Sequence, residues 1–235
     1  MAISPRPYED SLGSTAVLWI NKLMKFLVCV AVREEMRKFE TKSPLWREVR
    51  VLKTGMGPIN ARHSIRNELS QSTPKVVISC GFAGGLNPKL RPGNLLFSTS
   101  DVQIGKLFGG DFEHNKVKYL RSDRVISTSA EKRLIFATQG LDAVEMESWV
   151  IAEEAERLGI PSITLRVVLD SAAEDLPLDF SQFMDAQRNM IWSRFCWYVI
   201  RNPKTIRVLT PFNKEVSGAA GELAKGLKLL LEKMH

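Results

Sequence analysis

The sequence predicts an α/β fold: a single-domain three-layer sandwich with a central mixed, largely parallel twisted sheet flanked by helices. Two observations carry this prediction. Short apolar, β-branched runs such as Phe26–Val32 and Ser162–Leu169 have the length and composition of buried strands, and helical patterns separate them along the chain. At 235 residues, with 44% hydrophobic and 25% charged residues, the chain also has the size and composition of one globular domain.

The first hundred residues supply most of the predicted sheet. Phe26–Val32 is apolar throughout, which is typical of a central parallel strand. Gly55 and Gly57 indicate a tight turn where another strand or a ligand can approach the backbone closely. In order, we expect a strand at Phe26–Val32, a short helix at 35–40, a strand at Trp46–Leu52, a turn at Thr54–Gly57, a helix at 58–69, and strands at Lys75–Cys80 and Asn94–Ser98.

The clearest pattern lies in residues 142–170, after a polar stretch at 99–123 and a predicted strand at Arg124–Thr128. A helix is expected from Ser148 to Leu158, and the following glycine and proline end it. The next strand ends in Asp170, and the carboxyl end of a buried strand is where α/β proteins place chemistry. The local pattern alone favours a structural interpretation, in which Glu147 is an acid at the helix N-terminus and Asp170 caps the next turn.

The two ends of the chain differ in character from the middle. Residues 1–23 are predicted to be a mobile N-terminal extension with neither a signal peptide nor a spanning helix. Residues 24–184 form the expected α/β core. Residues 185–235 form a basic, aromatic, helical C-terminal segment, with helix candidates at Phe183–Ile200 and Gly218–Met234. We expect these helices to pack on the core or on a partner subunit. The alternative is contact with a membrane surface, which aromatic residues flanked by arginine suit.

The charge balance favours anionic partners. The formal net charge is +7, and from Asp185 onward nine Lys or Arg stand against four Asp or Glu, which places +5 in the C-terminal segment. No helix-turn-helix, zinc-finger or RNP motif accompanies this charge, so no specific nucleic-acid partner is expected.

The cysteines give no sign of a metal or a disulfide scaffold. Cys29, Cys80 and Cys196 lie far apart, and no Cys-x-x-Cys or Cys/His spacing accompanies them. We therefore expect no metal and no cofactor, and a reducing, cytoplasmic compartment. Cys80 follows the pattern of a small buried thiol rather than that of a nucleophile.

Four stretches in order resemble the nucleoside phosphorylase/nucleosidase superfamily, particularly the methylthioadenosine/S-adenosylhomocysteine nucleosidases. They are FLVCVAVREEM (26–36), VLKTGMGPINA (51–61), VVISCGFAGGLNPKLRPGNLLFS (76–98), and VEMES followed by LRVVLD (144–170). The resemblance covers roughly residues 24–180, and the ordered set is far more specific than any one motif.

The resemblance implies a purine nucleosidase that hydrolyses the N-glycosidic bond of an adenosine-type nucleoside. In such an enzyme Glu35 would activate water and Asp170 would donate a proton to purine N7. Glu147 would bind the ribose hydroxyls, Met146 would pack on the ribose, and the backbone of Phe82, Ala83 and Gly84 would lie along ribose and base. The resemblance also implies a homo-oligomer, a dimer or higher.

Some residues depart from the family pattern. Glu131 stands where the family has a purine-stacking aromatic, Phe82 replaces a small polar residue, and Leu169 replaces the serine before the catalytic aspartate. These departures leave the base and the 5′ substituent open. The basic tail resembles that of the hopanoid-associated nucleosidases. That resemblance implies a hydrophobic 5′ substituent, as in adenosylhopane, and peripheral contact with the inner membrane.

Two other functions remain open on the same fold. In the first loop Glu34 and Glu35 would repel phosphate, which favours water as nucleophile, but Arg33 keeps a phosphorolytic purine nucleoside phosphorylase possible. A non-catalytic nucleoside-binding or storage protein is the other alternative, and the presence of all three carboxylates argues against it. A flavodoxin-like or Rossmann protein ranks lower, because no G-x-G-x-x-G opens the first helix.

Overall fold

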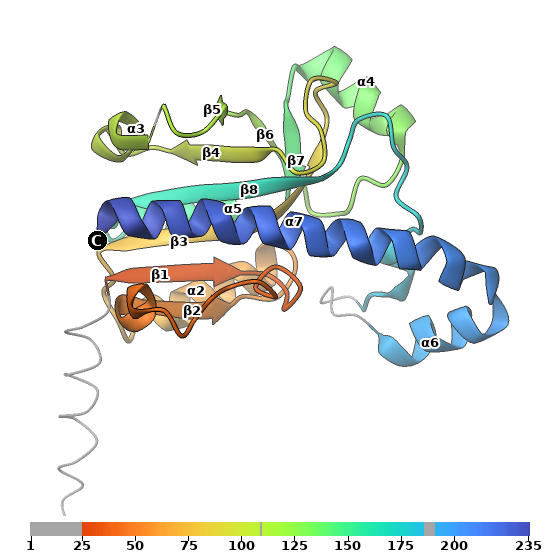
Figure 1. The fold of residues 1–235 in the computed structure, drawn as a ribbon, viewed down its shortest axis with the longest axis horizontal. Coiled ribbons are helices and arrows are strands. Elements are labelled where there is room, and N and C mark those ends of the chain that lie inside the picture. The colour runs from red at the N-terminus through yellow and green to blue at the C-terminus, as the bar shows by residue number, and fades with distance from the viewer. Residues whose placement is uncertain (1–24, 109, 186–190) are drawn as a thin grey trace, which may run out of the picture.

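The computed structural model of the protein describes residues 25–108, 110–185 and 191–235, and its centre is an eight-stranded sheet (Figure 1). The main strand order is β2-β1-β3-β8-β4-β5, and β7 pairs with both β3 and β6. The strands are β1 (Phe26–Val30), β2 (Val49–Lys53), β3 (Val76–Gly85), β4 (Leu95–Thr99), β5 (His114–Asn115), β6 (Tyr119–Arg121), β7 (Ala143–Glu145) and β8 (Ser162–Asp170).

The sheet is mixed and largely parallel, as predicted. β1 pairs in parallel with β2 and β3, and β3 pairs in parallel with β8 along most of its length. Among the strand pairs of the described residues, only β4 with β8 and β7 with β3 are antiparallel. Because β1, β3 and β8 run the same way, their carboxyl ends meet at one edge of the sheet. This is the edge at which α/β folds place ligands.

Helices cover both faces of the sheet, which confirms the three-layer sandwich. The described helices are α2 (Pro58–Leu69), α3 (Val102–Phe108), α4 (Ser129–Gln139), α5 (Ser148–Glu156), α6 (Trp192–Arg201) and α7 (Lys204–Met234), with short 3-10 turns at Pro44–Glu48 and Phe180–Phe183. α7 covers one face of the sheet, and α2 and α5 cover the other. The residues of β1 alternate between the layers: Phe26 and Val28 pack with α7, whereas Leu27 and Cys29 pack with α2 and α5.

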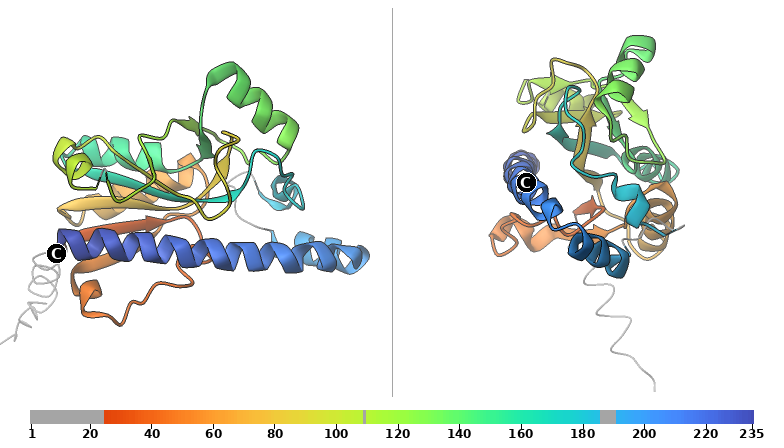
Figure 2. Two further views of the ribbon diagram at one scale, coloured as in Figure 1. Left: turned by 45° about the horizontal axis from the view of Figure 1, so that its top comes forward. Right: turned by 90° about the vertical axis from the view of Figure 1, so that its right-hand side faces the viewer.

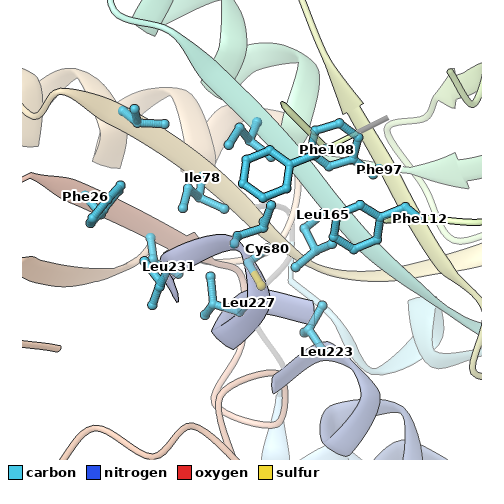
Figure 3. Packing of buried hydrophobic residues seen from close by; sticks show 14 of the residues in the cluster. Phe26, Ile78, Cys80, Phe97, Phe108, Phe112, Leu165, Leu223, Leu227 and Leu231 are labelled. Carbon is cyan, nitrogen blue, oxygen red and sulfur yellow. The ribbon is translucent and has the colours of Figure 1, made fainter. Parts of the chain in front are cut away.

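The C-terminal half of α7 forms the main core contact (Figure 3). Leu223, Leu227 and Leu231 are fully buried against the sheet. Gly226 lets the helix approach closely, since a Cβ there would lie 3.1 Å from Leu95. Each buried leucine contributes about 1.5–3 kcal/mol relative to an exposed one. The N-terminal half of α7 continues past the end of the sheet, and α6 lies beside it there (Figure 2).

Several predicted elements are wrong in type or extent. The helix expected at 35–40 is a series of turns, in which the N–H groups of Met36 and Phe39 bond the carbonyls three residues earlier. The strand expected at Arg124–Thr128 is absent, and the Thr128 hydroxyl instead caps α4. Residues 99–123, read as a polar loop, contain α3, β5 and β6.

The C-terminal helices also differ from expectation. α7 begins at Lys204 rather than Gly218 and runs through Pro211, a residue that sequence reading treats as a helix breaker. The candidate helix at Phe183–Ile200 is described only in part, as the 3-10 turn and α6. The predicted N-terminal extension, 1–23, lies outside the described residues. Among the described helices, none has the length and apolar character needed to span a bilayer.

Candidate active site

Glu35 lies at the carboxyl ends of β1 and β3, in the turns that follow β1. Its carboxylate accepts hydrogen bonds from the backbone N–H of Ala31 (2.7 Å), Val32 (3.1 Å) and Phe82 (3.1 Å), and the residue is 6% exposed. A side chain at Gly81 would collide with this carboxylate, so glycine is required there. Burial raises the pKa of Glu35 above its usual value, and nearby Arg166 opposes that rise.

Glu147 lies where β7 gives way to α5. Its Oε1 accepts a hydrogen bond from Gly57 N–H (2.7 Å), the residue before α2, whose φ of +83° favours glycine. Arg62 and Arg66 of α2 donate to Glu154 of α5 at 2.6 and 2.7 Å, which fixes the two helices beside each other. Burial raises the pKa of Glu147 to about 7, with Arg166 acting in the opposite direction.

The two residues before Glu147 are buried. Met146 is 8% exposed. Glu145 is 3% exposed, and its Oε2 accepts from the backbone N–H of Glu147 (3.0 Å) and Ser148 (2.6 Å) at the start of α5. Glu145 therefore sets the direction in which the chain enters α5, and with it the place of Glu147.

Arg166 is the cation around which these acids gather. It projects from the middle of β8, is 2% exposed, and donates to Glu145 Oε2 and Ser79 Oγ, each at 3.0 Å. It also lowers the pKa values of Glu35 and Glu147. The single positive charge of Arg166 thus faces three carboxylates, those of Glu35, Glu145 and Glu147. One cation does not offset the burial of all three, so the pKa values of Glu35 and Glu147 remain raised.

Asp170 ends β8 and pairs with Gly84 of β3 after a register shift at Ala83/Gly84. Its side chain is 13% exposed, so it is neither sealed in nor open to solvent. Its Oδ2 accepts a hydrogen bond from the ammonium of Lys132, which is fully buried. Burial raises the pKa of Asp170, and the Lys132 ammonium opposes the rise.

The β3 residues predicted to line the ligand follow the same edge. Phe82 and Ala83 pair with Val167 and Val168 of β8, and Gly84 lies beside Asp170. The side chain of Phe82 packs against the core under α7, and Ala83 is buried in a smaller cluster. Phe82, Ala83 and Gly84 have no polar side chain, so the edge of the sheet between Glu35 and Asp170 offers backbone groups to a ligand.

The spacing along β3 sets the distance between the acids. The Glu35 carboxylate lies at Gly81 and the Asp170 carboxylate lies near Gly84. Three residues of strand span about 10 Å, a distance that one small-molecule pocket covers. Glu35 and Asp170 therefore lie along the same edge of the sheet, and Glu147 bonds Gly57 in the turn that follows β2.

A cavity of about 330 Å³ lies elsewhere, beside the amino end of β8. Its walls include Ser98, Tyr119, Trp149 and Thr164, and among the acids around Arg166 only Glu145 reaches it. Within the described ranges, no group of three or more His, Cys, Asp or Glu residues is arranged to hold a metal ion.

Sequence reasoning missed three members of the site: Lys132, Glu145 and Arg166. Arg166 had a detectable signal, because a charged residue in the middle of a buried strand needs a partner. Glu145 directly precedes Met146 and Glu147, but its hydrogen bonds to the backbone at the start of α5 appear only in the folded structure. Lys132 gave no signal, since a lysine in the first turns of a helix is ordinarily exposed.

Known proteins share this sequence pattern and fold. The curated relatives include 5′-methylthioadenosine/S-adenosylhomocysteine nucleosidases from Anoxybacillus flavithermus (29% identical; 57% of this chain, 72% of the relative) and Bacillus licheniformis (27%; 59% and 75%). A Helicobacter pylori nucleosidase of the same name, solved in complex with a substituted pyrrolidinol, superposes with a TM-score of 0.65 at 16% identity. The match covers 89% of this chain and 98% of that one.

The family model for the phosphorylase superfamily matches residues 26–123 and 112–191. These matches cover more than half of the chain and include every acid described above. The chain therefore belongs to the phosphorylase superfamily.

Proposed function

We propose that this protein is a purine nucleosidase that hydrolyses the N-glycosidic bond of an adenosine-type nucleoside. The observation that carries the proposal is the set of three carboxylates, Glu35, Glu147 and Asp170, along the carboxyl edge of β1, β3 and β8. The relatives named as methylthioadenosine/S-adenosylhomocysteine nucleosidases support the same chemistry.

Cleavage of this bond needs three actions. The C1′–N9 bond breaks with its electron pair leaving on the purine, and Asp170 would deliver a proton to N7 of that purine. Positive charge develops on the ribose, where Glu147 would bind the hydroxyls and offset the charge. Water then adds to C1′, and Glu35 would take the proton that the water loses. Burial raises the pKa values of Glu35 and Asp170, the two groups that exchange protons in this scheme, as acid–base catalysis near neutral pH requires.

Water is favoured over phosphate as the nucleophile. The backbone N–H groups at the ends of β1 and β3 that could bind an anion already donate to Glu35. Arg166 is surrounded by carboxylates, so its charge is compensated. A phosphate ion would displace one of these acids or meet their negative charge.

The test is release of free base from methylthioadenosine, S-adenosylhomocysteine and inosine, with and without phosphate. We expect release in phosphate-free buffer and a loss of at least about 100-fold in Glu35→Gln, the range of one acid–base group. Glu34→Gln is the matched control, because Glu34 is the exposed neighbour. A strict requirement for phosphate would make the enzyme a phosphorylase. Binding without release would make the protein a nucleoside carrier.

We further propose that α6 contacts an anionic membrane surface and that the substrate carries a hydrophobic 5′ group. Trp197 and Ile200 of α6 are 55% and 78% exposed, and Arg201 lies over the Trp197 ring at 3.8 Å. Residues 191–214 contain five Lys or Arg and no Asp or Glu. An aromatic, basic helix of this kind suits the interface of a bilayer.

Vesicle sedimentation tests whether α6 binds an anionic membrane. We expect the protein to pellet with phosphatidylglycerol vesicles but not with phosphatidylcholine vesicles, and Trp197→Ser with Ile200→Ser to abolish pelleting. Leu134→Ser, which removes an exposed leucine of α4, is the control. If the native protein and the variant with Trp197→Ser and Ile200→Ser pelleted equally with phosphatidylglycerol vesicles, α6 would be excluded as the membrane contact. A cytoplasmic location at the inner membrane and a homo-oligomeric state complete the proposal, and sedimentation velocity tests the latter.

A further inference from the structure

The cavity beside the amino end of β8 has no part in the proposed cleavage. Its volume of about 330 Å³ lies at the lower end of the range for small-molecule pockets. The three carboxylates of the proposed reaction are not among its walls. These walls come from the end of β4, from β6, from the first turns of α5 and from the start of β8, and they include Ser98, Tyr119, Trp149 and Thr164.

Glu145 brings an unpartnered carboxylate oxygen to this cavity. The residue lines the cavity and is 3% exposed. Its Oε2 accepts hydrogen bonds from the N–H groups of Glu147 and Ser148 and from the Arg166 guanidinium. Its Oε1 is also buried, but it has no hydrogen-bond partner among the described residues. A buried carboxylate oxygen destabilises the fold unless a donor reaches it, so Oε1 requires a donor from within the cavity.

Trp149 brings an unpartnered donor to the same cavity. Its indole Nε1 is buried, and no described residue accepts a hydrogen bond from it. The guanidinium groups of Arg62 and Arg121 each lie 5.6 Å from the centroid of the ring, which holds the indole in place. An indole N–H can only donate. The cavity therefore needs an acceptor at Trp149 as well as a donor at Glu145.

These two atoms select the chemistry of a ligand. An anion would meet the negative charge of Glu145 without donating to it. An ammonium group would donate to Glu145 but could not accept from Trp149, whereas a hydroxyl group can do both. Further hydroxyl groups belong to the wall residues Ser98, Ser148 and Thr164, and each can donate or accept in turn. The walls thus suit a neutral molecule that carries several hydroxyl groups.

We propose that this cavity is a second ligand site, which binds a small neutral polyol of about pentose size. One hydroxyl group of the ligand donates to Glu145 Oε1, and another accepts from Trp149 Nε1. The proposal does not rest on the nucleosidase function, because the observations that carry it are the cavity and its two unpartnered atoms. The site borders the candidate active site through Glu145, whose other oxygen holds the backbone at the start of α5.

The indole N–H of Trp149 reports occupancy of the cavity by nuclear magnetic resonance. The chain has five tryptophans, and the indole resonance that is lost in Trp149→Phe belongs to Trp149. We expect D-ribose to shift this resonance along a saturable curve with a dissociation constant of about 1–10 mM, the range for a ligand with so few atoms. Ala152→Leu, which fills the cavity from α5, should abolish the shift. Ala137→Leu, the same change at an exposed alanine of α4, should retain it.

Each outcome decides the proposal. A saturable shift of the Trp149 resonance that Ala152→Leu removes and Ala137→Leu retains supports the site. A shift that persists in Ala152→Leu means that ribose binds elsewhere and overturns it, as does the absence of any shift up to about 100 mM ribose, tenfold above the weakest expected constant. A response to ribose 5-phosphate or ethanolamine at lower concentration than to ribose overturns the neutral polyol. If Ala152→Leu does not fold, Ser100→Leu blocks the same cavity from the exposed residue after β4 and takes its place.

Discussion

Glu147→Gln should stabilise the protein at alkaline pH while removing its activity. Burial beside Glu35 and Glu145 raises the pKa of Glu147 from its usual 4.5 to about 7. The folded protein therefore holds a proton that the unfolded chain releases, and the free energy of unfolding falls as the pH rises from 4.5 through 7. Glutamine has no charge to bury, and its amide oxygen can still accept from Gly57 N–H.

The magnitude follows from the pKa difference. Each pKa unit corresponds to about 1.4 kcal/mol, so ionising Glu147 costs the fold about 3 kcal/mol at pH 8 and about 1 kcal/mol at pH 5. In a protein of this size about 3 kcal/mol corresponds to a rise in Tm of about 6–12 °C. The stabilisation of Glu147→Gln should therefore be large at pH 8 and small at pH 5.

Denaturant unfolding of both proteins between pH 5 and pH 8.5 measures the effect. Glu156→Gln is the matched control, because Glu156 is an exposed carboxylate on the same helix, and its effect should stay within about 0.5 kcal/mol at every pH. Equal stabilisation by Glu147→Gln at pH 5 and pH 8.5, or a loss of stability at pH 8, would refute the claim that the buried charge of Glu147 destabilises the fold.

Three further substitutions test the surroundings of the acids. Arg166→Met should lower the free energy of unfolding by about 3–5 kcal/mol at pH 8 and by less at pH 5, because it leaves Glu145 unpaired; denaturant titration at both pH values measures this. Gly81→Ala should destabilise by about 1–3 kcal/mol and reduce base release, since its Cβ meets Glu35; native-like stability and rate would contradict that contact. Leu227→Ala should cost about 2–5 kcal/mol, and an unchanged Tm would show that α7 is dispensable.

The sheet was predictable because its strands are encoded locally. Phe26–Val30 and Ser162–Asp170 are apolar runs bounded by turns, and the structure has strands at both. The stretch Arg124–Thr128 is also rich in strand-forming residues, yet the Thr128 hydroxyl caps a helix that begins one residue later. Strand propensity alone does not predict that a side chain will cap a helix instead of continuing a strand.

The environment of the candidate site was less predictable than its positions. The sequence pattern placed acids at three separate points of the chain, and the parallel order of β1, β3 and β8 places them along one edge. The partners of those acids come from elements with no recognisable pattern. The sequence around Lys132 has no distinctive pattern, and Lys132 becomes a buried partner of Asp170 only because the fold brings this part of α4 beside the end of β8.

A structure of the protein with an uncleavable adenosine analogue tests the central claim most directly. The account predicts purine N7 at Asp170, ribose hydroxyls at Glu147, and a water molecule between Glu35 and C1′ of the sugar. An analogue held instead in the cavity beside Tyr119 and Trp149, away from Asp170, would contradict it.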